Sequence, residues 1–290
     1  MTNQENVKEF LASRRAKITP DKAGLPAYGG NRRVPGLRRE EVAMLAGVSV
    51  DYYNRLERGN LQGVSESVLD SVSKALQLDP AEHAHLFDLA RAANLSPAKR
   101  RKSSPQLVRP SVQRLLDAMT DAPAWVRNNR HDFLAGNRLA YALYADYFID
   151  PVRPANSARF MFLSEKSKDF YPNWERTADD VVAMLRSEAG TNPYDKDLSN
   201  LIGELSTRSE TFRTRWAAHN VRFHRAGTKQ LHHSVVGDLE LSYEAMELTS
   251  DPGLTFLAYT AEPGSASADG LRMLSSWAAT LELESIQAGN

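Results

Sequence analysis

The stretch from Leu37 to Gly59 constrains the fold more than any other part of the sequence. Its first apolar, helix-like run ends at Gly47, a residue type that closes helices in the left-handed conformation. Two residues later, Ser49 is suited to cap a second helix that begins at Val50. Two helices joined by a three-residue turn with a glycine form a helix-turn-helix unit. The sequence predicts such a unit here.

Apolar residues recur at helical spacing on both sides of this unit. The segment Asp79-Pro80-Ala81-Glu82 combines a capping acid, a proline and a second acid, which is typical of a helix start. The spacing predicts short helices over 7–17, 37–46, from 50 onward, over 68–76 and from 79 to 91. Residues 1–95 are therefore predicted to form an all-α domain.

Charge and composition limit the classes of protein to consider. The formal net charge is zero, but residues 1–104 carry a net charge of +5 and the rest of the chain −5, which favours nucleic-acid contact at the basic end. The absence of cysteine excludes disulfides, thiolate nucleophiles and zinc ribbons. No apolar run approaches the roughly 18 residues that cross a bilayer, and residues 1–10 lack a signal-peptide layout. We expect a cytoplasmic protein without a membrane partner.

Residues 96–110 are predicted to be a linker, because the stretch 94–110 holds three prolines, three serines and five basic residues without a sustained apolar period. Beyond it, strand-like and helical runs come in blocks. Strands are predicted over 124–126, 132–137, 228–235, 239–248 and 254–261, and helices over 173–189, 196–205, 210–218 and 266–280. This order predicts an α+β domain with an antiparallel sheet over 111–285.

The residues from 37 to 59, L-R-R-E-E-V-A-M-L-A-G-V-S-V-D-Y-Y-N-R-L-E-R-G, resemble the XRE-type, lambda-repressor-like helix-turn-helix family. The resemblance covers about residues 4–91. It implies that the second helix of the unit enters the DNA major groove and reads base edges.

The family's core positions are matched with two departures. Arg15 and Glu57 match an internal ion pair that ties the first helix to the recognition helix. Arg38 stands at the usual capping position of the first helix of the unit, and Tyr53 replaces a smaller aliphatic residue. Tyr53 must either pack into the core or direct its hydroxyl to a phosphate.

The same match implies base contacts from the exposed first turns of the recognition helix. By its chemistry, Arg55 suits guanine and Asn54 suits adenine, whereas Asp51 suits a cytosine amino group and Val50 a thymine methyl. The alternative for each residue is a solvated helix face. Phosphate contacts are expected from Arg38, Arg39, Ser49, Tyr52 and Arg58.

Residues 17–36 form an unusually long connection between the first two predicted helices, with three prolines and four glycines. A connection of this length is normally functional or disordered. Arg32 and Arg33 are candidates for a phosphate or minor-groove contact, and a flexible surface insert is the alternative.

A second resemblance extends over nearly the whole chain. Besides the long connection and the stretch 34–59, it is carried by W-V-R-N-N-R-H-D-F-L-A-G-N (125–137), Y-P-N-W-E (171–175), V-R-F-H-R-A-G-T-K (221–229) and Y-T-A-E-P-G-S (259–265). These segments are similar to the MmyB-like regulators, which pair an XRE domain with a PAS-like C-terminal domain. The resemblance implies a bound long-chain fatty acid, since family members bind one in that domain.

Aromatic residues concentrate after residue 110, as an apolar ligand pocket requires. The candidates to line it, on one face of a small sheet, are Trp125, Phe133, Phe160, Phe162, Trp174, Trp216, Phe223 and Phe256. Ordinary core packing is the alternative for each. For a ligand carboxylate the candidates are Arg127, Arg222, His224 and Arg225, and the sequence singles out none of them.

Two classes of function remain open. The first is a transcription regulator that binds a near-palindromic operator as a homodimer and senses a small apolar ligand such as a fatty acid. The second is a lipid or metabolite enzyme, or a carrier, with an appended DNA-targeting module. The sequence holds no catalytic motif, and the adjacent His232 and His233 would face opposite sides of a strand. We therefore expect no enzyme, no metal site and no cofactor apart from the fatty acid.

Overall fold

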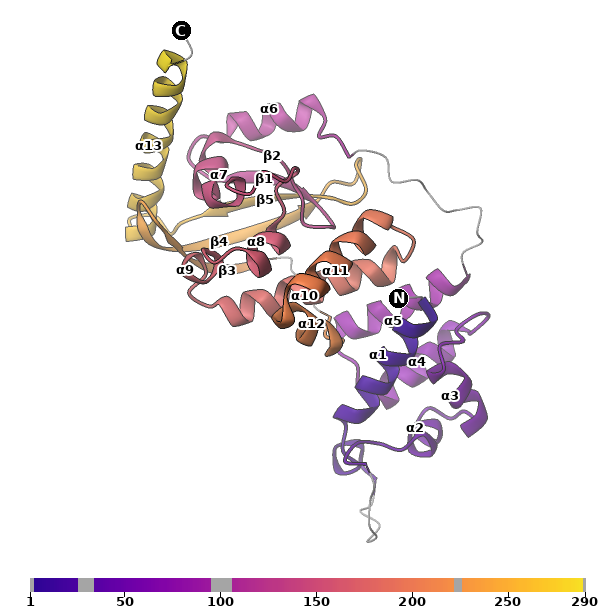
Figure 1. Cartoon of the computed structure of the whole chain (residues 1–290). Coiled ribbons are helices and arrows are strands. Elements are labelled where there is room, and N and C mark those ends of the chain that lie inside the picture. The colour runs from indigo at the N-terminus through magenta and orange to yellow at the C-terminus, as the bar shows by residue number, and fades with distance from the viewer. Residues whose placement is uncertain (1–2, 26–33, 95–105, 222–225, 289–290) are drawn as a thin grey trace. The chain divides into compact units, whose positions relative to one another are not determined.

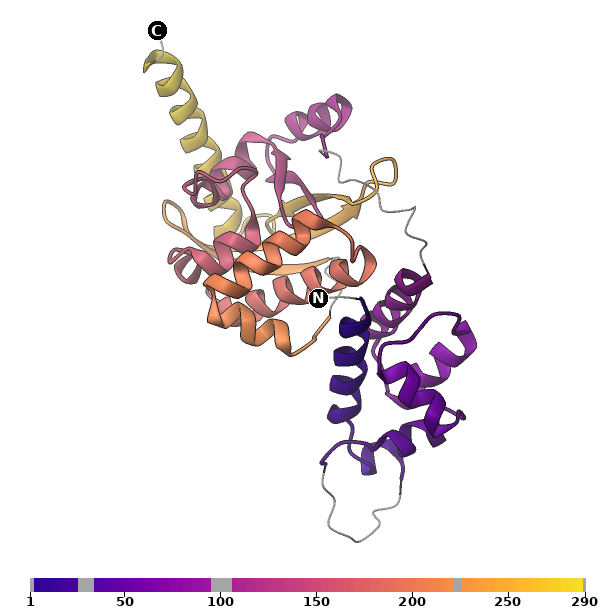
Figure 2. The ribbon, with the colours of Figure 1, turned by 45° about the vertical axis from the view of Figure 1, so that its right-hand side comes forward.

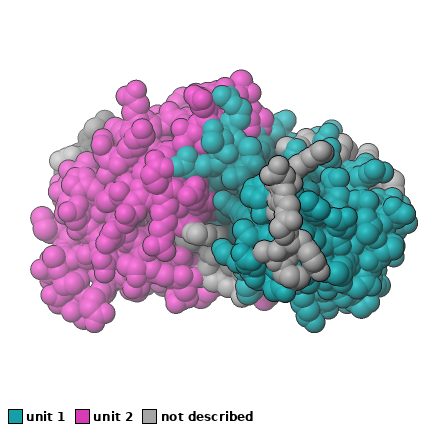
Figure 3. All heavy atoms as spheres, turned by 90° about the horizontal axis from the view of Figure 1, so that it is seen from below, with its two compact units in different colours: residues 1–103, 182–202, 213–223 teal, residues 104–181, 203–212, 224–290 magenta. Residues whose placement is uncertain are grey.

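The computed structural model describes residues 3–25, 34–94, 106–221 and 226–288. The chain divides into two compact units, coloured separately in Figure 3. Unit 1 comprises residues 1–103, 182–202 and 213–223, and unit 2 comprises residues 104–181, 203–212 and 224–290. Two segments from the second half of the sequence therefore belong to the same unit as the helix-turn-helix. The domain boundaries at 95 and 111 stay a prediction.

The first part of unit 1 is helical, as the spacing predicts (Figures 1 and 2). Its helices are α1 (Asn3–Lys17), η1 (Asp21–Ala23), α2 (Arg39–Leu45), α3 (Val50–Glu57), α4 (Glu66–Ala75) and α5 (Pro80–Asn94). Ser49 caps α3, because its Oγ accepts a hydrogen bond of 3.1 Å from the amide of Tyr52. Gly47 has φ +66°, the left-handed conformation expected after α2. Local signals thus fix both ends of the turn.

The second part of unit 1 comes from helices that also reach into unit 2. Helix α10 (Trp174–Thr191) begins in unit 2 and ends in unit 1, α11 (Lys196–Arg208) begins in unit 1, and α12 (Glu210–Ala217) ends in it. Val221, just after α12, is 4% exposed and belongs to the same apolar cluster as Val7, Phe10 and Leu56.

Unit 2 is built on an antiparallel sheet, so the expected α+β architecture is confirmed. Its strands are β1 (Ala124–Asn128), β2 (Phe133–Gly136), β3 (Ala226–His233), β4 (Gly237–Glu247) and β5 (Leu254–Thr260). They pair in the order β2-β1-β5-β4-β3. The helices that accompany them, beyond those shared with unit 1, are α6 (Pro110–Ala118), α7 (Arg138–Leu143), η3 (Ala145–Phe148), α8 (Ser157–Leu163), α9 (Ser167–Phe170) and α13 (Ala266–Ala288).

The two faces of the sheet bury different sets of side chains, because successive residues of a strand point to opposite faces. Trp125, Leu257 and Tyr259 lie on the face of a large aromatic core, to which α7, α8, α9 and α13 also contribute. Val126 and Phe256 lie on the other face, in a smaller cluster with residues of α6. In Figure 1 the yellow α13 continues well past the sheet. Within the described ranges, no helix is both long and apolar enough to span a membrane.

Candidate DNA-binding surface and ligand-binding core

The recognition helix α3 presents most of its predicted base readers to solvent. Asp51 and Arg55 are exposed, Val50 is 44% exposed and Asn54 is partly buried. The guanidinium carbon of Arg55 lies 5.2 Å from the centre of the Tyr52 ring, a cation–π distance. An exposed arginine held against an aromatic ring keeps its forked donors available for a base edge or a phosphate.

A pocket of about 470 Å³ brings several of these residues together. Its lining consists of Gln4, Asp51, Asn54, Arg55, Arg58 and Asn60. Gln4 of α1 and Asn60 were not predicted. Gln4 reaches this surface because Gly59, with φ +94°, lets the chain after α3 approach the main chain of Gln4, where any Cβ would overlap it. This close approach of Gly59 to Gln4 was not predicted from the sequence.

An ion-pair network fixes the base of the recognition helix. The carboxylate of Glu57 accepts hydrogen bonds from Arg15 Nε at 2.8 Å and Nη2 at 2.9 Å, which confirms the predicted pair. Arg39 Nε donates to the same carboxylate at 2.9 Å. The Glu57 side chain is only 2% exposed. Burial alone would raise the pKa of this carboxyl, but the bonds and charges of Arg15 and Arg39 hold the pKa below its usual range.

The predicted phosphate contacts divide by their existing partners. Arg58 is exposed, and Arg38 is exposed with a 3.3 Å pair to Glu40. Arg39 is about half exposed but also bonds Glu57. The Ser49 oxygen already accepts the capping bond, and Tyr52 is partly buried. Arg32 and Arg33 lie outside the described residues.

Both departures from the family pattern have a structural account. Tyr53 is fully buried, so it packs into the core and does not reach a phosphate. Arg38 makes no side-chain capping bond at the start of α2. Instead, the carboxylate of Glu41, the third residue of α2, accepts a 2.6 Å hydrogen bond from the Arg38 amide. This bond gives an amide at the start of the helix an acceptor.

The core of unit 2 contains buried tyrosine hydroxyls among aromatic rings. The hydroxyl of Tyr144 donates to that of Tyr259 at 3.0 Å, and the hydroxyls of Tyr147 and Tyr171 are also hydrogen-bonded to each other. All four side chains are at most 3% exposed. Burial raises the pKa of Tyr144, Tyr147 and Tyr171 far above the ordinary value. These hydroxyls are therefore neutral donors in an apolar setting.

Arg127 of β1 is the one predicted headgroup candidate that lies among the described residues, and its charge acts on the tyrosine cluster. It is 9% exposed, and its charge lowers the pKa of Tyr147 and Tyr243 against the stronger, raising effect of burial. One of its guanidinium nitrogens lies 3.1 Å from His131 Nε2. Arg222, His224 and Arg225 lie outside the described residues.

The 125–137 motif builds the support of Arg127. His131 Nδ1 lies 3.1 Å from the Ser157 hydroxyl, so both ring nitrogens are engaged. The Asp132 carboxylate accepts bonds of 2.8 Å from the side-chain amides of Asn128 and Asn156. The contacts of His131 with Arg127 and Ser157 form a buried chain of polar groups that supports the Arg127 side chain.

The predicted pocket aromatics do not all meet. Trp125, Phe133 and Phe160 belong to the aromatic core, with Trp125 and Phe133 stacked at 4.7 Å, and Phe162 and Trp174 pack against it. Phe256 lies on the opposite face of the sheet, Trp216 belongs to unit 1, and Phe223 lies outside the described residues. Their role in binding a ligand stays a prediction.

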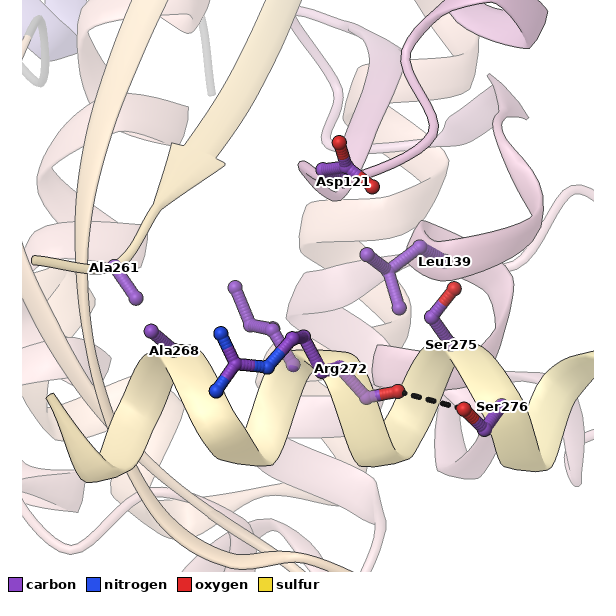
Figure 4. Close-up of a pocket in the computed structure, with 8 residues that line it drawn as sticks. Asp121, Leu139, Ala261, Ala268, Arg272, Ser275 and Ser276 are labelled. Atoms are coloured by element: carbon purple, nitrogen blue, oxygen red, sulfur yellow. Dashed lines mark hydrogen bonds between the residues drawn. The ribbon is translucent and has the colours of Figure 1, made fainter. Parts of the chain in front are cut away.

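Unit 2 has further hollows at its surface. A pocket of about 260 Å³ shares Tyr147 and Phe160 with the aromatic core. A larger one of about 540 Å³ lies along α13, where Arg272 and Asp121 are its charged lining residues (Figure 4). Within the described residues, no group of three or more His, Asp or Glu side chains is placed to hold a metal ion.

Comparison with families of known proteins gives two matches. Residues 108–274 match the MmyB-like transcription regulator ligand binding domain, and residues 10–86 match a helix-turn-helix domain. The first match includes the tyrosine cluster and Arg127, and the second includes α3 and the Arg15–Glu57 pair. No curated protein matches the chain at a significant level.

Proposed function

Because the chain belongs to the family of MmyB-like transcription regulators, we propose that it reads operator DNA through α3 in response to a long-chain fatty acid bound in unit 2. The helix-turn-helix match supports the DNA-binding half, and the ligand-binding-domain match supports a small-molecule ligand. The tyrosine cluster is the observation that favours a fatty acid over other apolar molecules.

The tyrosine cluster suits a carboxylate at the end of an apolar chain. Two hydroxyls that bond to each other use one of their two hydrogens, so each pair retains a second donor for a ligand oxygen. Arg127 supplies a positive charge on the same side, and charge-assisted bonds are the strong ones in a water-poor site. The surrounding rings of Phe160 and Phe170 offer apolar contact for an acyl chain.

The route to the cluster starts at the 260 Å³ pocket, since Tyr147 and Phe160 line both. In the described state these side chains are at most 5% exposed. Entry of an acyl chain therefore requires rotation of one or both rings, which couples ligand entry to a change in the aromatic core.

Titration of the purified protein with oleate, followed by tryptophan fluorescence, tests the ligand. The double variant Tyr147→Phe/Tyr171→Phe keeps ring volume but removes both hydroxyls, and we expect affinity to fall about tenfold, as loss of one or two hydrogen bonds implies. Tyr194→Phe, at an exposed tyrosine, is the matched control. Equal affinity of all three proteins would refute the tyrosine site. Turnover of added acyl substrate would favour the enzyme alternative.

A single helix-turn-helix makes few base contacts, so we expect a homodimer that reads two half-sites about one helical turn apart. Selection of bound sequences from a random DNA pool, followed by footprinting on the most enriched sequence, tests this expectation. A single short asymmetric site, bound by a monomer in light scattering, contradicts it.

A further inference from the structure

Unit 1 contains residues that the family match assigns to the ligand-binding domain. Residues 182–202 and 213–221, here called the docking segment, lie within the matched range 108–274 but pack with α1 and α5 of the helix-turn-helix region. The docking segment comprises the last part of α10, the start of α11 and the end of α12 with the residues that follow it. Its contacts with α1 and α5 are polar as well as apolar.

The contact with α1 centres on Arg14. This side chain is 2% exposed, and its Nε lies 3.2 Å from the Glu82 carboxylate of α5. Its guanidinium also donates to the main-chain carbonyl of His219, after α12. One turn further along α1, Lys17 Nζ donates to Asn220 Oδ1 at 2.9 Å. Helix α1 is thus bonded to the chain that follows α12.

Arg186 of α10 contacts the same region of the chain, the end of α12 and the residues after it. Its guanidinium carbon lies 3.9 Å from the centre of the Trp216 ring, and the same group donates to the Trp216 carbonyl. A second guanidinium nitrogen lies 2.9 Å from His219 Nδ1. On the far side of that ring, His219 Nε2 lies 2.9 Å from the Glu9 carboxylate of α1. Arg14 and Arg186 therefore meet at one buried histidine.

The contact with α5 depends on a glycine. Gly190 of α10 lies so close to the buried ring of His85 that a Cβ would come within 2.4–2.7 Å of two ring atoms. The neighbouring Thr191 hydroxyl donates to Asp88 at 3.1 Å. Any side chain larger than hydrogen at position 190 must displace α10 from α5 or move the ring.

The burial of two arginines opposes the hydrogen bonds that hold the docking segment against α1. Burial lowers the pKa of Arg186 to about 9, and burial with the charges of Arg186 and Arg14 lowers the pKa of His219 to about 3. Holding two arginines out of water costs free energy, and separation of the docking segment from α1 would remove the bond of Arg14 to the His219 carbonyl. Release of the segment would break several of these polar bonds together, because they share Arg14 and His219.

Helix α1 links the docking segment to the recognition helix. Arg14 bonds the docking segment, and the next residue, Arg15, bonds Glu57 at the end of α3 and the Leu37 carbonyl before α2. A shift of α1 must therefore displace α3 or break the partly buried hydrogen bonds of Arg15. We propose that release of the docking segment from α1 and α5 is the step by which the ligand-binding domain changes the affinity of α3 for DNA. This inference rests on the DNA-binding half of the proposed function and not on the identity of the ligand.

Gly190→Ala tests the inference with a single methyl group. In a helix this change favours folding by itself, so a defect would come from the overlap with His85. Gly203→Ala is the matched control, since Gly203 lies in α11 and a Cβ added there would meet nothing within 4 Å. We expect operator affinity of the ligand-free full-length protein, measured by fluorescence anisotropy, to change at least about fivefold for Gly190→Ala and not for Gly203→Ala.

Two charge variants probe the same contact from opposite sides. Arg14→Gln and Arg186→Met remove the buried guanidinium groups, with Lys8→Gln, at an exposed lysine of α1, as the control. We expect both to change operator affinity in the same direction as Gly190→Ala. The ratio of affinities with and without oleate should shrink toward one. A role limited to packing would change both affinities equally and leave that ratio intact.

The failures can be told apart. Wild-type affinity in Gly190→Ala, Arg14→Gln and Arg186→Met overturns the inference. Where oleate changes the operator affinity of the wild type, an unchanged oleate ratio in all three variants overturns it as well. If oleate leaves the wild type unchanged but the variants still alter operator affinity, the fatty-acid proposal fails and the inference stands. If no protein binds DNA, the inference fails together with the DNA-binding half on which it rests. Amide hydrogen exchange tests release by itself: α1 must exchange faster in Gly190→Ala than in Gly203→Ala, and equal exchange refutes release.

Discussion

The apolar core of the helix-turn-helix region and the aromatic core of unit 2 bury different chemistry. The first consists of aliphatic side chains with Phe10 and Tyr53, and its charged network is gathered at Glu57. The second buries paired tyrosine hydroxyls and, beside them, Arg127. An aliphatic core holds one shape, as a surface that reads bases requires. A core with hydroxyl donors that do not all have an acceptor would be stabilised by a ligand that accepts hydrogen bonds from them.

The largest expected effect lies in the first core. Glu57→Gln leaves Arg15 and Arg39 without their carboxylate, and breaking a buried ion pair costs about 3–5 kcal/mol. We expect urea unfolding to show a loss near the lower end of that range, because Arg39 is partly exposed. Glu40→Gln, in an exposed pair with Arg38, should cost less than about 0.5 kcal/mol. Similar losses in both variants would mean that Glu57 does not fix this core.

The second core should instead respond to its ligand. Bound ligand adds RT ln(1 + [L]/Kd), which is about 2.7 kcal/mol at a hundredfold excess over Kd. We expect delipidation to lower the melting temperature of the full-length protein and added oleate to restore it. The restoration should be smaller in Tyr147→Phe/Tyr171→Phe at the same oleate concentration. An unchanged melting temperature on both treatments would mean that the tyrosine cluster is ordinary core.

On the DNA-binding surface, Arg55→Ala should relax base preference at one position of each half-site. The expected cost on the preferred sequence is about 1–3 kcal/mol, the range for a lost bidentate base contact. Binding to single-base variants of the selected operator measures it. An equal loss on every sequence would reassign Arg55 to a phosphate.

Two buried histidines of unit 1 should make the free energy of unfolding fall in acid. His85 and His219 have their pKa lowered from 6.5 to about 3, so the unfolded state binds more protons in acid. Their stabilising contribution is complete above pH 6.5 and falls by about 1 kcal/mol per pH unit per histidine below it. The charges of Arg14 and Arg186 act on both rings, and Glu9 pairs with His219, so each histidine is compared with its own Gln variant. Urea unfolding of His219→Gln should show a shallower acid slope than wild type.

At alkaline pH the sign is reversed in unit 2. Tyr144 and Tyr147 have their pKa raised in the folded state, so their contribution is complete below the unfolded value of about 10 and is lost as pH rises through the folded value. Tyr147→Phe should lower the alkaline slope of unfolding and leave the acid slope unchanged. Equal alkaline slopes would place the titration elsewhere.

The features that were predicted correctly from the sequence are those set by residues close together in the chain. Gly47, Ser49 and the Asp79–Glu82 start announce helix ends through residues two or three positions away, and each predicted helix of residues 1–95 forms. The antiparallel sheet followed from strand-like runs and turns. No helix was predicted between 138 and 170, where α7, α8 and α9 are each seven residues or shorter, too brief to show a period.

The candidate sites were harder because they depend on distant residues. Composition gathers aromatics but does not say on which face of a sheet they lie, so Phe256 was grouped with Trp125 although they lie on opposite faces. The tyrosine hydroxyls were missed, since pairs such as Tyr144 and Tyr259 are 115 positions apart. The contact between Gly190 and His85 was not predicted, because a glycine inside a helix does not indicate which residue packs against it.

The continuity of α10 through both units bears on how such proteins can be recombined. A chimaera joined at residues 96–110 would combine this docking segment with the helix-turn-helix region of another protein. Residues such as Gly190 would then pack against an α1 and an α5 of different sequence. If α3 reads the operator as proposed, we expect an exchange of operator specificity to succeed when residues 182–202 and 213–221 are exchanged with the N-terminal region, or when only the exposed positions of α3 are grafted. In this chain, the unit that contains the helix-turn-helix is built from three separate stretches of the sequence.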